Sequence, residues 1–149
     1  MEIKFWTSDG KIDSELFSSK AEKLAETVFD GQLRNSKANK PTQLRKFYDE
    51  VMRFDSMLKS VPPDKQNDEF EKILPYLKML NAKAAYAMGR DLVTKEFKDF
   101  IAQSLSQVNN RNDFEVFNGL FEAFMGFYKY YDEKGERPQR EYSNKGGRR

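Results

Sequence analysis

The stretch NDFEVFNGLFEAFMGFYKYY, residues 112–131, decides the fold of this chain. Its apolar side chains recur at helical spacing, and its polar stripe is limited to Glu115, Asn118, Glu122 and Lys129. A helix that is apolar around most of its circumference must be covered on most sides. The stretch is therefore either the centre of a helical bundle or a helix partly buried against another subunit.

Two local patterns refine this predicted helix. Asn112 followed three residues later by Glu115 indicates a capping box at its start. Gly119, Ala123 and Gly126 share one edge, where a neighbouring helix would be able to approach closely.

Apolar spacing is helical along nearly all of the remaining chain, which predicts an all-α, elongated, single-domain bundle of about five helices. The other helices are expected near residues 14–29, from Thr42 to about residue 60, from Asn67 to Gly89, and over 92–108. Proline restricts the residue before it, so a kink is expected near Pro75. Only Ile3 and Phe5 alternate as in a strand.

Two segments are expected outside the packed helices. The bundle domain covers residues 1–131, and within it residues 31–41 carry three cations, no acid and two asparagines, which predicts a flexible basic loop. Residues 132–149 are polar, glycine-rich and net basic, which predicts a disordered tail.

The composition argues against an enzyme. The 149 residues include neither histidine nor cysteine, so catalysis would depend on Asp, Glu, Lys or Tyr, and neither a cofactor nor a metal is expected. A hydrolase or lyase using Glu122, Tyr128 and Lys129 has no supporting spacing. The first residues lack the apolar core of a secretion signal, and no run approaches the ~20 apolar residues that span a bilayer. We therefore expect a cytoplasmic protein that does not enter a membrane.

A second stretch, KILPYLKMLNAKAAYAMGR at residues 72–90, has four cations and no acid. An acid-free stretch of this length is expected by chance, and the net charge is only +2. Evidence for a binding site must therefore come from where the cations lie on the helix. Helical phase separates two edges of this stretch. The predicted core edge is Leu77, Leu80, Ala84 and Met88, and the predicted presented edge is Met79, Lys83, Tyr86 and Arg90.

Lys78, Lys83 and Arg90 have no acid three or four residues away, so only an acid from another helix would pair with them. Arg45 and Lys46 are instead followed by acids four residues on, which favours a self-paired helix face. Met79 and Tyr86 beside cations suit stacking on ribose or bases, although side chains of this kind are more often core or interface.

Three blocks in order, QLRKFYDEV at 43–51, LPYLKMLNAKAAYAMGRD at 74–91 and LFEAFMGFYKYY at 120–131, resemble the small helical subunit of type III-A CRISPR effector complexes, the Csm complex. The resemblance implies a non-catalytic, all-helical subunit. It also implies several copies in an inner filament along the guide RNA and its paired target RNA, beside the other Csm subunits. The RNA contacts that it implies are Lys83 and Arg90, followed by Lys78, Arg45 and Lys46.

Two functions remain open. The first is binding of the guide RNA and target RNA duplex through its backbone, without sequence specificity. The second is a helical adaptor or scaffold that binds only protein, which the very apolar helix and the modest net charge favour. The same apolar helix predicts self-association, as a homodimer of the isolated protein and as a filament in the complex.

Overall fold

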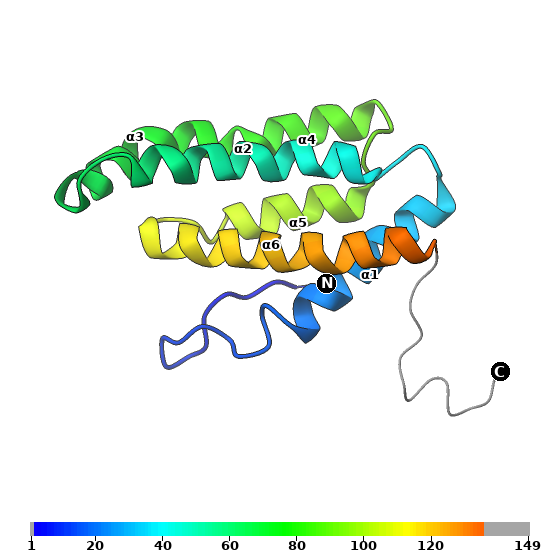
Figure 1. Ribbon diagram of the computed structural model, residues 1–149, viewed down its shortest axis with the longest axis horizontal. Coiled ribbons are helices and arrows are strands. Elements are labelled where there is room, and N and C mark those ends of the chain that lie inside the picture. The colour runs from blue at the N-terminus through cyan, green and yellow to red at the C-terminus, as the bar shows by residue number, and fades with distance from the viewer. Residues whose placement is uncertain (1, 136–149) are drawn as a thin grey trace.

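The computed structural model describes residues 2–135, and these form a bundle of helices that run close to its long axis (Figure 1). The elements are α1 (Ser19–Arg34), α2 (Pro41–Lys59), a 3₁₀ turn η1 (Pro63–Lys65), α3 (Gln66–Lys78), α4 (Leu80–Gly89), α5 (Lys95–Leu105) and α6 (Arg111–Lys134). α3 and α4 are one bent helix, so residues 2–135 contain five helices and no strand. The predicted all-α bundle is confirmed.

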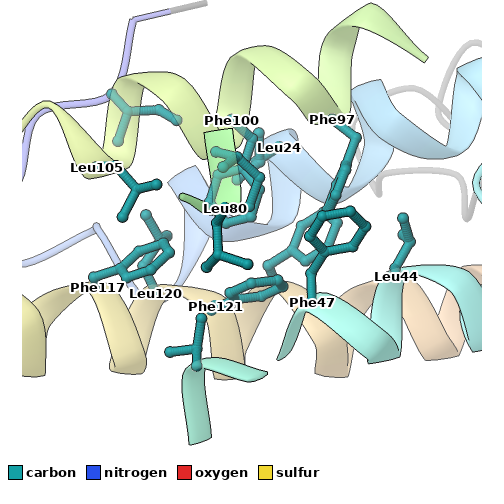
Figure 2. Close-up of a cluster of buried hydrophobic side chains, with 14 of the residues drawn as sticks. Leu24, Leu44, Phe47, Leu80, Phe97, Phe100, Leu105, Phe117, Leu120 and Phe121 are labelled. Atoms are coloured by element: carbon teal, nitrogen blue, oxygen red, sulfur yellow. The ribbon is translucent and has the colours of Figure 1, made fainter. Parts of the chain in front are cut away.

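α6 is the central helix of the bundle. It packs against α1 and α2, and its phenylalanines meet those of α5, with ring centroids 5.1 Å apart for Phe100 and Phe121. Figure 2 shows side chains from several helices converging on this cluster. Other helices of the chain thus cover the apolar face of α6. Its buried apolar side chains are Phe114, Val116, Phe117, Leu120, Phe121, Phe124, Tyr128 and Tyr131.

The start of α6 differs from the predicted capping box. The cap is Asn110, whose side-chain oxygen accepts a hydrogen bond of 2.8 Å from the backbone N–H of Asp113. Asn112 lies inside the first turn and is exposed. The cap therefore lies two residues earlier than expected. It satisfies the free N–H of Asp113 in the way that Asn112 was expected to satisfy the N–H of Glu115.

The expected kink near Pro75 is present as a bend centred on Met79, four residues later. Pro75 lies within α3, where its missing N–H leaves one carbonyl without a helical donor. The N–H of Met79 donates to the carbonyls of both Pro75 and Tyr76, at 3.2 Å each, which tightens the turn before α4 begins. α3 and α4 thereby follow α2 as one bent helix along its length (Figure 1).

The segment expected as a flexible loop over residues 31–41 is shorter in the structure. α1 continues through Arg34, and α2 begins at Pro41, so only six residues connect the two helices. Two of these six, Ala38 and Asn39, are completely buried. The connection is therefore packed against the bundle along part of its length.

Asn39 bonds to three other parts of the chain, with its backbone in the left-handed region at a φ of 58°. Its amide nitrogen donates to the carbonyl of Val28 at 2.9 Å and to the hydroxyl of Thr94 at 2.8 Å, and its amide oxygen accepts from the N–H of Thr94 at 2.9 Å. Its backbone carbonyl accepts from the Tyr128 hydroxyl, and its N–H donates to the carbonyl of Leu92 at 2.9 Å. These bonds connect α1, the α4–α5 junction and α6.

The N-terminal segment is held by side chains of α5 and of the turn that follows it. The N–H of Ile3 donates to the side-chain oxygen of Gln103, and the N–H of Phe5 donates to that of Gln107, each at 2.9 Å. The Gln107 amide donates in return to the carbonyl of Ile3 at 2.7 Å. Ile3 and Phe5 are buried while Lys4 is exposed, so the alternation seen in the sequence is preserved without a partner strand.

The edge of small residues on α6 does not receive a neighbouring helix. A Cβ on Gly119 would lie 2.9 Å from the ring of Phe17, which comes from the segment before α1, whereas a Cβ on Gly126 would have no atom within 4 Å. α6 extends to Lys134, three residues into the predicted tail of 132–149, and residues 136–149 of that tail lie outside the described residues.

We predict opposite effects for two glycine replacements. Gly31→Ala should lower the free energy of unfolding by about 1–3 kcal/mol, because the new Cβ would lie 2.7 Å from the hydrogen-bonded side chains of Asn39 and Thr94. Gly126→Ala should raise it by roughly 0.5–1 kcal/mol, because that helical position is open. Urea denaturation followed by circular dichroism measures both, and stabilisation by both would contradict the close approach at Gly31.

Candidate nucleic-acid interface

A groove runs between α2 and the bent helix α3–α4. It consists of two adjoining hollows of about 400 Å³ and 260 Å³, which share Glu50 and Lys83 at their junction. The charged side chains that line the two hollows are Lys46, Glu50, Arg53, Glu69, Lys72 and Lys83. Four cations face two carboxylates, so this groove alone carries as large a net charge as the entire chain, which is +2.

The α3–α4 side of the groove bears one continuous stripe. Its members recur at intervals of four, three, four, three and four residues, and they are Lys72, Tyr76, Met79, Lys83, Tyr86 and Arg90. The apolar members are well exposed, at 62% for Tyr76, 48% for Met79 and 66% for Tyr86. The four residues of the predicted presented edge, Met79, Lys83, Tyr86 and Arg90, are all exposed.

The predicted core edge of this helix is right at Leu77, Leu80 and Ala84, which are buried, and wrong at Met88. Met88 is 37% exposed, and Ala87 is buried in its place. The last turn of α4 leads into the α4–α5 junction, where the carbonyl of Ala87 accepts the N–H of Leu92 at 2.9 Å. Ala87 is buried because it continues the helical spacing of Leu77, Leu80 and Ala84, at intervals of three, four and three residues.

Glu50 is shared by two cations at the centre of the groove. Arg53 donates to both of its carboxylate oxygens, at 3.2 and 2.8 Å, and the ammonium of Lys83 lies 3.4 Å from one of them. The Arg53 hydrogen bonds, assisted by the charge of Lys83, lower the pKa of Glu50. The carboxylate therefore stays ionised at neutral pH, and the stabilisation it provides is lost only as the pH falls through that lowered pKa.

The other predicted RNA-binding residues occupy different surroundings. Lys78 lies at the α3 end, where its ammonium donates to the carbonyl of Leu105 at 2.6 Å and so caps α5. Arg45 pairs with Asp49 at 3.7 Å, and both side chains are exposed. Lys46 lines the smaller hollow and makes no ion pair with another residue of the described range.

Arg90 lies at the end of the stripe, beyond α4. Its guanidinium lies 5.8 Å from the centre of the Tyr86 ring, and one of its nitrogens donates to the Tyr86 hydroxyl at 3.3 Å. Neither interaction neutralises the positive charge, so Arg90 keeps its full charge for an external anion.

Three residues of the groove were not among the sequence candidates. Lys72 and Tyr76 lie before the bend, and Arg53 lies on the facing side of α2. The spacing that identified Met79, Lys83, Tyr86 and Arg90 continues without interruption through Lys72 and Tyr76. It would have revealed both residues if the helix had been treated as continuous across Pro75.

The fold and the groove together define a small helical-bundle protein with a basic surface that includes exposed tyrosines. A family model described as Csm2 Type III-A matches residues 11–134, which include every helix of the bundle. The chain therefore belongs to the Csm2 family and is the non-catalytic small subunit of a type III-A CRISPR complex. This result confirms the resemblance found in the sequence.

Comparison with curated proteins and with solved structures gave no match.

The described residues show neither a membrane-spanning helix nor a metal site. No helix in residues 2–135 is long and apolar enough to span a bilayer. The same residues contain no group of three or more acidic side chains arranged to hold a metal ion.

Lys78 and Lys83 should respond differently when the ammonium is removed and the aliphatic stem is kept. Lys78→Met should lower the free energy of unfolding by about 1.5–3 kcal/mol, because it breaks a charged hydrogen bond that caps α5. Lys83→Met should change it by less than about 0.5 kcal/mol, because the ion pair of Lys83 is solvent-exposed. Thermal and urea unfolding of both variants checks this, and equal losses would contradict the capping role of Lys78.

Proposed function

We propose that this subunit binds the phosphate–ribose backbone of the guide RNA and its paired target RNA through the groove between α2 and α3–α4. The observation that carries the proposal is the surplus positive charge of this groove, where Lys72 and Lys83 of the stripe face further cations on α2. Arg90 lies at the end of the same stripe, outside the residues that line the two hollows. Cations in excess of neighbouring acids attract a polyanion and release its counterions on binding.

The candidate contacts now have an order. Lys83 and Arg90 lead because they lie on the stripe, and Lys46 follows because it faces the smaller hollow without an ion pair to another described residue. Arg45 comes last among the proposed contacts, because it lines neither hollow and a phosphate there would compete with Asp49. Lys78 takes no part in the proposed contacts, because its ammonium is engaged by α5.

Contacts of this kind read the backbone and shape of RNA, so pairing of guide with target supplies the sequence specificity. A single copy should bind weakly, since few phosphates are contacted. Several copies on one RNA, held beside the other Csm subunits as a filament, would gain affinity through effective concentration.

The alternative of an adaptor that binds only protein rested on the apolar character of α6 and on the modest net charge. Most apolar side chains of α6 are buried within this chain, and Tyr130 is 49% exposed, so packing within the chain accounts for most of the apolar character of α6. The homodimer expected for the isolated protein rested on the same apolar helix. Sedimentation of the purified protein, with and without RNA, would test self-association directly.

Charge reversal of the two leading residues tests the proposed function. Lys83→Glu combined with Arg90→Glu should reduce RNA retention by the assembled complex. The plot of log affinity against log salt has a negative slope, and its magnitude should decrease by about 0.7–0.9 for each phosphate that the variant no longer binds. RNA binding across a salt series measures both quantities, and urea unfolding verifies that the bundle is intact.

The matched control is Lys11→Glu combined with Lys23→Glu, which makes the same change in net charge at two exposed positions away from the groove. It should leave the salt slope unchanged. An unchanged slope in the groove variant, or an equal loss in both variants, would contradict backbone binding at the groove.

Removal of the negative charge at the centre of the groove should tighten RNA binding. Glu50→Gln keeps the side-chain shape but no longer neutralises Arg53 and Lys83. A carboxylate about 4 Å from a bound phosphate costs roughly 1 kcal/mol in water, so the affinity should rise about fivefold at low salt. Asp49→Asn is the control, because Asp49 lines neither hollow and pairs with Arg45. Weaker binding by Glu50→Gln than by the unmodified protein would count against a phosphate site between Arg53 and Lys83.

A further inference from the structure

We infer that the α3–α4 stripe is a binding site for unpaired RNA nucleotides, whose bases stack on Tyr76 and Tyr86. This inference rests on the proposed function and deepens it. Backbone contacts alone do not distinguish paired from unpaired RNA, whereas exposed aromatic rings beside cations do.

The two tyrosines are the most exposed large apolar side chains of the described residues. Neither ring packs against another aromatic ring in residues 2–135, in contrast to the rings of Tyr48, Tyr128 and Tyr131, which pack on phenylalanines. The groove tyrosines thus contribute little to the core. Met79 lies between them on the same stripe and is also exposed, so the stripe offers a discontinuous apolar surface within a basic groove.

Each ring has a cation on the same helical face. Lys72 precedes Tyr76 by four residues, Lys83 precedes Tyr86 by three, and the Arg90 guanidinium lies 5.8 Å from the centre of the Tyr86 ring. Residues three or four apart on a helix are neighbours. A base stacked on either ring would therefore have a cation within reach of its own or the adjacent phosphate, as in sites for single-stranded nucleic acid.

The chemistry favours unpaired over paired RNA. Bases inside an A-form helix are stacked on each other, and the deep major groove excludes side chains, so a tyrosine ring cannot stack on them. Unpaired bases expose a face that an aromatic ring can cover, whatever the base. Cations alone would be sufficient to bind the backbone of a duplex. Two exposed aromatic rings would then add no affinity for it.

The spacing of the rings sets the length of the site. Tyr76 and Tyr86 are ten residues apart along the bent helix, or roughly 15 Å at 1.5 Å per residue. At about 3.4 Å per stacked nucleotide, this distance corresponds to roughly four nucleotides. The two rings would thus bracket a short unpaired segment.

The test compares an unstructured 15-nucleotide RNA with the blunt duplex that it forms with its complement, both bound to the full-length protein at low salt. Fluorescence anisotropy gives the affinities. The unmodified protein should bind the single strand more tightly than the duplex. Tyr76→Leu and Tyr86→Leu should each weaken single-strand binding about tenfold and leave duplex binding and the salt slope unchanged, while the Tyr→Phe variants should stay within about twofold.

The outcomes separate this inference from the proposed function. Absence of binding to either RNA overturns both. If binding depends on Lys83 and Arg90 but the tyrosine variants have no effect, or weaken both RNAs equally, only the stacking site fails. If the leucine variants bind RNA normally and fail to join the other Csm subunits, the tyrosines contact protein and the inference is wrong. Urea unfolding of each variant verifies that these exposed replacements leave the bundle stable.

Discussion

The buried side chain of Asn39 is the contact on which the arrangement of the helices depends. An amide with no access to water must satisfy its donors and its acceptor within the protein, and the Asn39 side chain does so with Val28 of α1 and with Thr94, the residue before α5. The backbone carbonyl of Asn39 accepts from the Tyr128 hydroxyl of α6. Burial also raises the pKa of the Tyr128 phenol, so that hydroxyl remains a donor over the physiological range. Loss of any partner would leave a buried polar group unpaired, which is costlier than the loss of an exposed hydrogen bond.

The groove is a consequence of this arrangement. Asn39 directly precedes Lys40 and Pro41, where α2 begins, and its backbone is bonded to Leu92 just after α4 ends. One end of α2 is therefore held beside one end of α4. At the other end of the groove, the turn through η1 connects α2 to α3. The two walls are fixed at both ends, while Tyr76, Lys83 and Tyr86 between them are exposed and available to a ligand.

Local patterns predicted the helices well, because each depends on residues close in sequence. The stripe from Met79 to Arg90 follows from helical phase alone, and the burial of α6 follows from its composition. Distant pairs were beyond such reasoning. Lys83 meets Glu50 across 33 positions, and Asn39 lay in a segment that looked like an open basic loop because its partners are mostly far away in the chain. Met88 was misplaced because the buried positions of this helix recur at alternating intervals of four and three residues, which puts Ala87 and not Met88 after Ala84 on the core side.

The two glutamines that hold the N-terminal segment show how a helix can stand in for a strand. Gln103 of α5 and Gln107, two residues past its end, are four residues apart, or roughly 6 Å at the helical rise, and Ile3 and Phe5 are two residues apart, or about 6.6 Å in extended chain. The near match of these repeats allows a column of amides to set the register of an extended segment. One inserted residue between Ile3 and Phe5 would turn one of the two side chains outward and disrupt the amide bonds, so the length of this segment is as constrained as that of a strand within a sheet.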